Sequence, residues 1–549
     1  MVSTTAVDAG TDLVDRIRRS VIGEGTIMNG PYGPLRITYA DYTASGRALT
    51  FVEDAIRHRV LPFYANTHTE SSGTGRVTTN LREQARRTIR DCVGGTDQHA
   101  VIFCGSGTTG AVAKMAALLD HGRGDERRKV VFVGPYEHHS NELIWRELAD
   151  RVVTVPTDRH GRVDVDALDA MLRSHADWPV RIGSFSAGSN VTGALTDVDT
   201  ISSCLHRHGA LAMWDYAAAG PYLPIRMIES APGRGDHKDA VFLSPHKFPG
   251  GPQTPGVLVV DRRLARRPVP TVPGGGTITF VSPTGQQYVD DAEAREEGGT
   301  PAIVESIRAG MVFALKRRVG TERIEAAEQR LCRTAITRWR ANPCLEVLGD
   351  LDQPRLPIVS FRVRHAGQLL HHAFVVAVLS DLFGIQARGG CSCAGPYGHR
   401  LLHITDERSA AIDAEVARGR LGVKPGWARI GFNYFFSDTV ADYLIEAVDL
   451  TARYAHRLLG EYRFEPRSGL WRHWDSLHQT NLIVDDLTAV PPSPPAYLGE
   501  DVLARQLDNA RAVFASRPDT VPAGPTGLPG TFESLREFHL PPQCVSEWD

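Results

Sequence analysis

One lysine stands at an unusual place in the sequence. In SPHKFPGG (residues 244–251), Lys247 follows an apolar run and precedes a Pro-Gly-Gly turn. A lysine at the mouth of a sheet extends its ammonium group into water less easily than a lysine on a helix face. It is either an ordinary strand-end lysine or an amine that bonds to a carbonyl compound. The neighbouring motifs decide between these two interpretations.

A glycine-rich turn in CGSGTTGAVAKM (104–115) is expected between a strand and a helix. The free N–H groups of the helix start and the hydroxyls of Thr108 and Thr109 would bind a phosphate. The same letters satisfy the dinucleotide pattern GxGxxG. However, the next strand ends in VFVGPYEHHS, without the carboxylate that binds a ribose, and no Walker lysine is present. One phosphate therefore fits better than a dinucleotide.

Three more polar side chains follow predicted strands. His138 lies in EHHSNELIW, Asn190 in GSNVTG and Asp215 in MWDYAAAG. Ligands gather at the carboxyl ends of strands in open α/β sheets, although a histidine there is equally well a surface residue. The apolar residues before Asp215 predict that it is buried, and a buried carboxylate needs a partner. A protonated heteroaromatic nitrogen would serve.

Together these residues predict a pocket for pyridoxal 5'-phosphate. Lys247 would hold the aldehyde as an imine, which also removes the need to hydrate an ammonium group. Asp215 would keep the pyridine nitrogen protonated. The phosphate ligands would be Thr108, Thr109, Ser244 and His246.

Short β-branched runs predict the elements that position these side chains. The runs are residues 99–104, 129–133, 151–156, 181–186, 210–215, 240–243 and 256–260. Their apolar character and helix-length spacing are typical of a mostly parallel sheet buried on both faces, and hence of an α/β fold.

We expect four parts along the chain. They are an N-terminal arm (1–29), a large cofactor-binding α/β domain (30–275), a small α+β domain with a cysteine loop (276–460) and a Pro-rich C-terminal extension (461–549). The Pro/Gly-rich stretch at 266–277 marks the main boundary. PPSPPAY and DTVPAGPTGLPG predict an extended, partly irregular tail.

The composition excludes several classes of protein. A chain of 549 residues is too long for one core, and 42% hydrophobic with 23% charged residues is typical of globular proteins. No apolar run approaches the ~20 residues of a membrane span, and the N-terminus lacks a secretory pattern. A net charge of -3 predicts no general attraction to nucleic acid or to a membrane. Eight cysteines do not form a disulfide framework here, so we expect the cytoplasm.

The ordered motifs resemble the class V aminotransferase superfamily, and most closely its cysteine desulfurases. The similarity runs from YADYTASG (39–46) and ANTHTESSG (65–73) through SPHKFPGG, GGGT (274–277) and EEGGTP (296–301) to RIGFNYFFSD (429–438). It implies the type I fold of pyridoxal phosphate enzymes, with a large sheet domain and a smaller α+β domain. It also implies a homodimer with its sites at the subunit interface.

The resemblance implies further roles. His138 would stack on the cofactor ring, Asn190 would hydrogen-bond its phenolic oxygen, and Thr277 would reach the partner subunit's phosphate. Arg429 would hold the α-carboxylate of an amino-acid substrate, a role that suits a guanidinium group. The sequence leaves open whether His138 or His139 stacks on the ring.

A cysteine segment, RGGCSCAGPYGH (388–399), resembles the Arg-x-Gly-x-x-Cys-Ala loop of desulfurases through Arg388, Gly390, Cys393 and Ala394. The resemblance implies that Lys247 moves protons while the Cys393 thiolate attacks the sulfur of substrate cysteine, leaving a persulfide and alanine. Arg388 would lie beside the substrate and favour the thiolate. Cys391 makes the segment similar to molybdenum cofactor sulfurases as well. It is either a resolving thiol or a small packed residue.

A zinc site is the alternative interpretation of this segment. Cys391, Cys393, His399 and His403 follow the pattern C-x-C-x₅-H-x₃-H. Such a site would remove the nucleophile. Because C-x-C is a tight spacing for zinc and the Arg-x-Gly frame already has an explanation, we expect no metal.

Three features depart from the family pattern. Ala218 replaces a glutamine that assists Asn190, residues 403–426 form a charged insertion, and the segment after 460 is additional. The leading prediction remains a cysteine desulfurase or related C–S lyase that passes sulfur to an unknown acceptor. Alternatives are an aminotransferase or epimerase acting on another amino acid, and a degenerate scaffold that binds a partner through the tail.

Overall fold

The computed structural model describes residues 12–67, 69–120, 128–475, 484, 488 and 495–545. The chain forms two compact units. Unit 1 comprises Met1–Ile22, Tyr42–Ala327 and Gln353–Leu356, and unit 2 comprises Gly23–Asp41, Glu328–Asp352 and Pro357–Asp549. The predicted boundary near residue 275 therefore falls inside unit 1, and the predicted extension is part of unit 2. Residues 1–11 of the predicted arm and 491–494 of PPSPPAY lie outside the described residues.

Unit 1 is built on a seven-stranded sheet with the order β4-β10-β9-β8-β7-β5-β6. Its strands are β4 (His99–Cys104), β5 (Lys129–Val133), β6 (Arg151–Thr154), β7 (Val180–Ser186), β8 (Leu211–Asp215), β9 (Ala240–Leu243) and β10 (Gly256–Asp261). Only β10 runs antiparallel to its neighbours. The predicted mostly parallel sheet is thus confirmed, and every strand agrees with its predicted bounds to within two residues.

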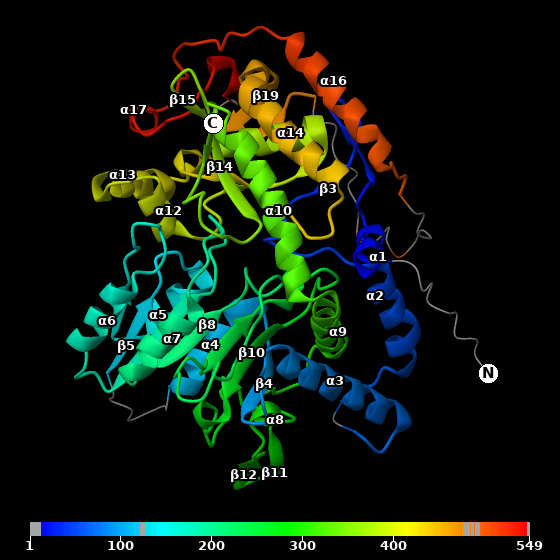
Figure 1. Ribbon diagram of the computed structural model, residues 1–549, viewed down its shortest axis with the longest axis vertical. Helices are drawn as coiled ribbons and strands as arrows, with labels where there is room; N and C mark the ends of the chain where they lie inside the picture. The colour runs from blue at the N-terminus through cyan, green and yellow to red at the C-terminus, as the bar shows by residue number, and fades with distance from the viewer. Residues whose placement is uncertain are drawn as a thin grey trace. The chain divides into compact units, whose positions relative to one another are not determined.

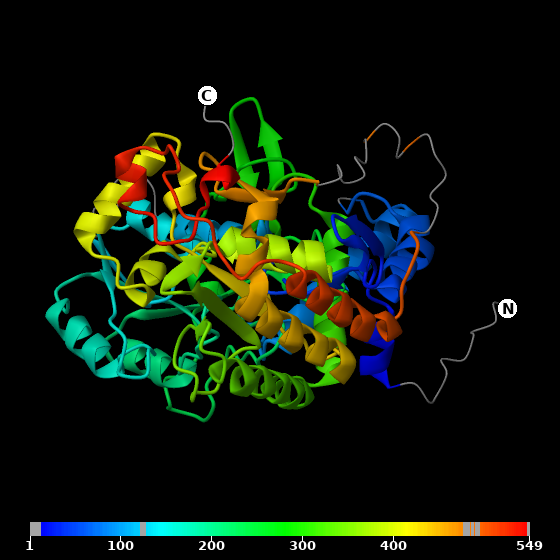
Figure 2. The same cartoon turned by 90° about the horizontal axis from the view of Figure 1, so that it is seen from above.

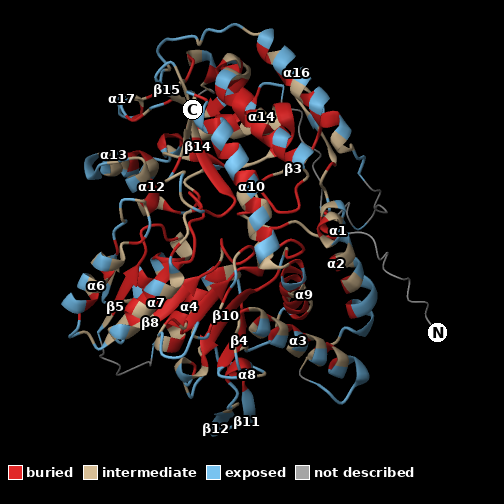
Figure 3. Ribbon diagram, viewed as in Figure 1, coloured by how far each residue is buried: buried red, intermediate tan, exposed pale blue. Residues whose placement is uncertain are grey.

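Helices cover this sheet because its strands are apolar on both faces. The helices between the strands are α4 (Gly107–Leu119), α5 (Leu143–Leu148), α6 (Val165–Ser174) and α7 (Val198–Arg207). Val112 and Met115 of α4 join Ile102, Met213 and Leu258 of the sheet in one fully buried cluster. Figure 1 shows α4 and α7 against the strands, and Figure 3 shows the sheet as almost continuously buried.

The remaining elements of unit 1 flank the sheet. They are α1 (Leu13–Arg19), α2 (Thr50–Ala55), α3 (Gly73–Cys92), α8 (Ala292–Glu296), α9 (Ile303–Val319) and the hairpin of β11 (Ile278–Ser282) with β12 (Gly285–Tyr288). α3 packs along α9, whose Gly310 leaves no room for a Cβ against Ala85. The hairpin is largely exposed (Figure 3).

Unit 2 contains an antiparallel sheet with the order β13-β14-β18-β17, and β15 pairs with β14. The strands are β13 (Leu345–Val347), β14 (Ile358–His365), β15 (Gln368–Leu370), β17 (Arg388–Gly390) and β18 (Trp427–Gly431). Three small pairings accompany it: β1 (Ile27–Gly30) with β2 (Gly33–Arg36), β3 (Thr38–Tyr39) with β16 (Ile385–Gln386), and β19 (Tyr462–Glu465) with β20 (Leu470–His473). The strand predicted at 356–363 corresponds to β14.

The helices of unit 2 come from several segments of the chain, among them the insertion and the extension. They are the second part of α10 (Thr321–Arg340), α11 (His372–Phe383), α12 (Gly395–Leu401), α13 (Asp406–Ala417), α14 (Asp438–Tyr454), α16 (Leu503–Ala515) and α17 (Gly530–Glu533). Figures 1 and 2 show α16 lying along α14. The extension is therefore less irregular than predicted, because Leu503, Ala510 and Phe514 give α16 a buried apolar face. Among the described helices, none combines the length and the hydropathy that a membrane crossing requires.

A buried ion cluster ties the helical flank of unit 1 to β4. Glu297 accepts hydrogen bonds from Arg82, from Arg86 at 2.8 and 3.0 Å, and from the Phe103 N–H at 2.6 Å. Its side chain is 5% exposed. Burial raises the pKa of this carboxyl, but Arg86 and Arg82 outweigh that effect and hold the pKa below its usual value. The EEGGTP motif thus contributes a structural carboxylate.

Replacing Glu297 with alanine is expected to destabilise unit 1. Arg82 and Arg86 would remain buried without their carboxylate, a change that typically costs about 3–5 kcal/mol. Urea unfolding should show a loss of this size for Glu297→Ala. The exposed Glu70→Ala serves as the matched control and should change the free energy of unfolding by less than about 0.5 kcal/mol. Equal unfolding midpoints for the two variants would contradict this account.

Candidate active site

The carboxyl ends of five strands meet at one edge of the unit 1 sheet. Ser186 at the end of β7 pairs with Asp215 at the end of β8, and Asp215 pairs with Phe242 of β9. Gly256 at the start of the antiparallel β10 pairs with Cys104 at the end of β4. The segments that follow these strands carry the predicted site residues, so the topology collects them at this edge.

The start of α4 packs closely against the SPHK segment, and glycines line the contact. The Thr108 N–H donates to Ser244 Oγ at 2.9 Å, and the two hydroxyls lie 2.8 Å apart. Gly107 has φ +54°, and a Cβ there would lie 3.0 Å from Ser244 Oγ. A Cβ on Gly256 would lie 1.9 Å from the Gly107 carbonyl oxygen. Only glycine fits this cradle, whose donors suit a phosphate.

Thr109 and His138 are connected through Ser140, which the sequence analysis did not single out. The Thr109 and Ser140 hydroxyls lie 2.6 Å apart, and the Ser140 N–H donates to His138 Nδ1 at 3.1 Å. Because Nδ1 accepts this bond, a neutral His138 ring carries its proton on Nε2. The neighbouring ring of His139 lies 6.3 Å away, centroid to centroid.

Asp215 and Lys247 form the electrostatic centre of this group. Asp215 is 4% exposed, and burial raises the pKa of its carboxyl to about 6. The Ala217 N–H, which donates at 2.7 Å, and the charge of Lys247 act in the opposite direction. The predicted burial of Asp215 is confirmed, and Lys247 is close enough to interact with it.

Burial and the charge of Lys247 lower the pKa of His246 to about 4. The imidazole is therefore neutral at physiological pH, so it would meet a phosphate as a hydrogen-bond donor rather than as a cation. The His246 carbonyl accepts from the Gly46 N–H at 2.8 Å, which packs the YADYTASG segment against SPHK.

A second buried carboxylate, Glu137, escaped the sequence analysis. It accepts hydrogen bonds from the Ser186 N–H at 2.8 Å and from Ser186 Oγ and Asn141 Nδ2, each at 2.6 Å. Burial raises the pKa of its carboxyl to about 7, and the charge of Asp215 adds to this effect. In the sequence, the only sign of a role for Glu137 is its position directly before His138.

Asn190 and Thr277 complete the predicted cofactor set in unit 1. Asn190 is buried in the loop that follows β7. Thr277 is fully buried within its own chain, and its hydroxyl donates to the Gly274 carbonyl at 2.7 Å. The role predicted for Thr277 at a partner subunit stays a prediction.

Unit 2 contains the two predicted substrate-binding arginines as neighbours. Arg388 of β17 pairs in register with Arg429 of β18. Asp41 contacts both, with Arg429 Nη2 donating at 2.9 Å and Arg388 Nε lying 3.3 Å from the carboxylate. Arg429 is 3% exposed and Arg388 is half exposed. Asp41 is a positioning residue that the motif contained but the sequence analysis did not assign.

The cysteine loop lies between β17 and α12. Ser392 and Cys393 both adopt the left-handed conformation, with φ values of +53° and +56°. Non-glycine residues rarely adopt this conformation. The Trp427 Nε1–H donates to Ser392 Oγ at 3.2 Å and holds the loop against β18. Cys393 is exposed and Cys391 is partly buried.

The alternative zinc site does not form in the described residues. His399 uses both ring nitrogens within the protein, since Nδ1 lies 2.9 Å from the Gly395 carbonyl and Nε2 lies 2.9 Å from Ser409 Oγ. The groupings of potential metal ligands within the described chain do not include Cys391, Cys393, His399 or His403.

The residues of unit 1 fit pyridoxal phosphate. A buried acid with a raised pKa needs a cationic partner, which a pyridinium nitrogen supplies. The glycine positions here have no room for a Cβ, and the neighbouring hydroxyls of Thr108 and Ser244 are donors of the kind that a phosphate requires. Such a set on a mostly parallel sheet defines a cofactor-dependent enzyme of the α/β class.

The chain belongs to the class V aminotransferases, whose family model matches residues 38–415. This membership identifies a pyridoxal phosphate-dependent enzyme. The chain is 27% identical over 367 residues, 66% of its length, to a probable cysteine desulfurase of Halalkalibacterium halodurans, covering 84% of that protein. It is likewise 27% identical over 383 residues, 68% of its length, to a probable cysteine desulfurase of Staphylococcus aureus, covering 87% of that protein.

Solved structures share the fold. A cysteine desulfurase from Thermococcus onnurineus aligns with a TM-score of 0.63 at 23% identity, over 76% of this chain and 95% of that one. The Escherichia coli cysteine desulfurase CsdA aligns with a TM-score of 0.60 at 22% identity, over 76% of this chain and 94% of that one. The predicted type I fold is confirmed.

Asp215→Asn should have opposite effects on the stability of the cofactor-free protein and on cofactor binding. The pKa of Asp215 is raised from 3.8 to about 6 in the folded state, so between these values the folded protein keeps a proton that the unfolded chain has lost. The stability of the wild type therefore falls by about 3 kcal/mol as the pH rises through this range.

The asparagine variant should lack this fall and should bind pyridoxal phosphate more weakly, because a neutral amide does not balance a pyridinium charge. Unfolding of the cofactor-free protein between pH 4 and pH 8 and a titration by visible absorption measure the two effects. Asp166→Asn, on the exposed surface of α6, is the control. Unchanged pH dependence together with unchanged affinity in Asp215→Asn would refute the assigned role.

Proposed function

We propose that this enzyme is a cysteine desulfurase that forms a persulfide on Cys393 and releases alanine. The observation that carries the proposal is the cysteine loop. An exposed thiol stands on a strained segment, beside the strand pair that holds Arg388 and Arg429. The names of the relatives support the same activity.

The residues of unit 1 would hold and tune the cofactor. Thr108, Ser244 and the start of α4 would bind its phosphate through N–H and hydroxyl donors, with neutral His246 as a further donor. Asp215 would balance the ring nitrogen, and Lys247 would hold the aldehyde carbon. When bound, pyridoxal phosphate supplies an electron sink for the substrate's Cα.

Proton transfer would fall to Lys247. Its amine would accept a proton from the substrate's Cα and return a proton to it. Asp215, which interacts with Lys247, would remain ionised beside a cationic ring, since a positive neighbour lowers the pKa of a carboxyl. Glu137, buried behind this group, would keep Ser186 and Asn141 in place as a positioning residue.

Arg429 would bind the substrate carboxylate. Its guanidinium is almost fully buried and already pairs with Asp41, so it is oriented before a substrate arrives. A planar fork held in this way suits bidentate binding of a carboxylate. Arg388, more exposed on the next strand, would add positive charge near the same group.

The sulfur transfer needs no external oxidant. The Cys393 thiolate would attack the substrate's Sγ, the new S–S bond would form, and the Cβ–Sγ bond would break with its electron pair passing to the substrate's carbon. Protonation at that carbon gives alanine. The products are alanine and one Cys393 persulfide per substrate cysteine, and the persulfide is the group that an acceptor would take.

A homodimer, an acceptor of unknown identity and a cytoplasmic location complete the proposal. The buried hydroxyl of Thr277 would need to turn from Gly274 to reach the partner subunit's phosphate. All eight cysteines are free thiols, which suits a reducing compartment.

Cys393→Ala should abolish alanine and persulfide formation from cysteine while leaving the visible absorption of the bound cofactor unchanged. The thiol acts on the substrate and not on the cofactor. Its loss should therefore stop the reaction without changing the absorption of the bound cofactor. Alanine is measured by chromatography, and the persulfide by mass spectrometry of the alkylated protein. Cys391→Ala is the matched control and should retain activity within about twofold.

Undiminished alanine release by Cys393→Ala would exclude the persulfide mechanism and favour another amino-acid reaction in the same pocket. A protein that binds no pyridoxal phosphate would favour the scaffold alternative.

A further inference from the structure

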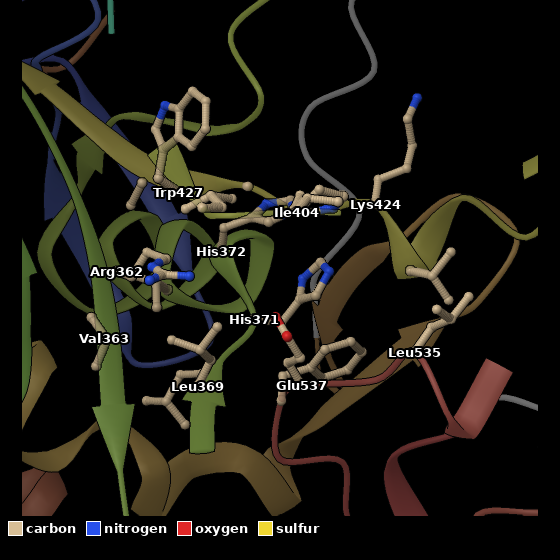
Figure 4. A pocket seen from close by; sticks show the side chains of 18 of the residues that line it. Arg362, Val363, Leu369, His371, His372, Ile404, Lys424, Trp427, Leu535 and Glu537 are labelled. Carbon is tan, nitrogen blue, oxygen red and sulfur yellow. The ribbon is translucent and has the colours of Figure 1, made fainter. Parts of the chain in front are cut away.

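A cavity of about 250 Å³ in unit 2 is lined largely by apolar side chains, among them Val363, Leu369 and Leu535 (Figure 4). The acid in the lining, Glu537, is already paired with Arg408 at 2.9 Å. The lining therefore does not identify a ligand. Side chains with metal-binding chemistry lie elsewhere, in unit 1.

His206, His237 and Asp239 form a compact two-histidine group in unit 1. Each residue offers one ligand atom, and these atoms all lie within 4.8 Å of one another. His206 lies in the last turn of α7, and Asp239 directly precedes β9. The predicted cofactor residues follow the carboxyl ends of the strands, so the two-histidine group stands at the opposite edge of the sheet. It is therefore separate from the candidate active site.

The Asp239 carboxylate is fixed in place by the neighbouring strands. The Asp239 N–H donates to the Ala212 carbonyl, and the Asp239 carbonyl accepts from the Asp261 N–H, each at 2.9 Å. Oδ2 of Asp239 accepts from the Ala212 N–H at 2.8 Å. The side chain is only 6% exposed. A buried carboxylate held in this way needs a positive partner.

His206 meets an acceptor at each of its ring nitrogens. Nδ1 lies 2.6 Å from the Gly235 carbonyl oxygen, which only accepts, so Nδ1 carries a proton. Nε2 lies 2.9 Å from Asp239 Oδ2. In a neutral ring with its proton on Nδ1, the lone pair of Nε2 would therefore face a carboxylate oxygen. A cation between these two atoms, either a second ring proton or a metal ion, removes the repulsion.

The bond from His206 to Gly235 is also the bond that a metal ligand requires. A histidine that binds a metal through one ring nitrogen usually donates the other N–H to a carbonyl or a carboxylate. This second bond fixes the orientation of the ring. His206 is thus oriented to present Nε2 to an ion beside Asp239.

His237 supplies the third ligand atom. Its ring stacks on that of His206, with centroids 3.9 Å apart and planes 10° apart. Burial and the charge of His206 lower the pKa of His237, so its ring is neutral at physiological pH and keeps a lone pair. The His237 side chain is 32% exposed, which leaves the group open to solvent on this side.

The charges around the two-histidine group favour a cation. Besides Asp239, the carboxylate of Glu229 stands beside the group, with Oε1 3.9 Å from His237 Nδ1. Arg263, whose charge acts on His237, is paired with Asp261 at 2.6 Å. This arginine is therefore already balanced and does not neutralise the other two carboxylates.

The ligand set suits zinc. Two imidazole nitrogens and a carboxylate oxygen, with water in the fourth position, form a common zinc arrangement. Tetrahedral zinc with bonds of about 2.0–2.1 Å keeps two ligand atoms about 3.3 Å apart. The 2.9 Å between His206 Nε2 and Asp239 Oδ2 would need to open only slightly to admit the ion.

A neighbouring group, formed by Asp169, Cys204 and His208, lacks these properties. Arg173 and Arg207 both pair with the Asp169 carboxylate and supply its positive charge. Burial raises the pKa of Cys204 to about 11, so the thiol stays protonated. This group has no need of a metal ion and provides a control within the same unit.

We propose that His206 Nε2, one ring nitrogen of His237 and the Asp239 carboxylate bind a zinc ion. At His206 the zinc–nitrogen bond takes the place of the second ring proton, which passes to solvent. The ion links the end of α7 to the start of β9. Its role is therefore to stabilise this edge of the sheet, independently of the reaction at Lys247.

The test compares zinc uptake by the full-length holoenzyme and its variants. Protein treated with a chelator is dialysed at neutral pH against buffered Zn²⁺, and the metal is counted by inductively coupled plasma mass spectrometry. We expect the wild type to hold one more zinc ion per chain than His237→Gln, and His237→Gln to bind at this site at least tenfold more weakly. Zinc bound by Cys391 and Cys393 is common to both proteins and cancels in the difference.

His208→Gln is the matched control and should take up zinc like the wild type. Thermal unfolding is the second readout, since an ion that binds only the folded state stabilises it. Zinc should raise the melting temperature of the wild type and of His208→Gln more than that of His237→Gln. Equal zinc uptake by the wild type and His237→Gln would overturn the proposal. Loss of the ion in His208→Gln alone would also overturn it, because the zinc would then lie at Asp169.

Discussion

A carboxylate buried at the end of a parallel strand is the constraint on which the site depends. Asp215 is 4% exposed, and burial raises the pKa of its carboxyl to about 6. Its ionised form requires a positive partner. Lys247 supplies part of that charge in the protein itself, and a pyridinium ring would supply more. The strand registers that place Ser186, Asp215 and Phe242 side by side bring these groups to one edge of the sheet.

Close backbone packing fixes the other half of the site. Gly107, Gly46 and Gly256 each stand where a Cβ would meet a neighbouring backbone or side-chain atom, so the start of α4, the YADYTASG segment and the SPHK segment approach as closely as bare backbones allow. This packing aligns Thr108 with Ser244. In unit 2, the Asp41 carboxylate orients Arg388 and Arg429 by contacting both guanidinium groups.

The sequence predicted the strands of unit 1 well because a strand buried on both faces is a continuous apolar run with turn residues at its ends. The sequence also predicted which motifs lie at the same edge of the sheet, because the carboxyl ends of parallel strands all lie at one edge. It did not predict Glu137, Ser140 or Asp41, whose roles come from partners brought near by folding, such as Ser186 for Glu137 and Arg429 for Asp41. The neutral state of His246 depends on burial, and the order of α16 on contacts with α14, neither of which a local pattern encodes.

The central claim is that Lys247 bonds covalently to pyridoxal phosphate, and chemical trapping tests it most directly. The full-length protein is loaded with the cofactor, reduced with borohydride, digested and mapped by peptide mass spectrometry. This account predicts a pyridoxyl group on the peptide that contains Lys247 and none in Lys247→Ala. A label confined to another lysine, such as Lys238 or Lys316, or no label at all after cofactor addition, would contradict it.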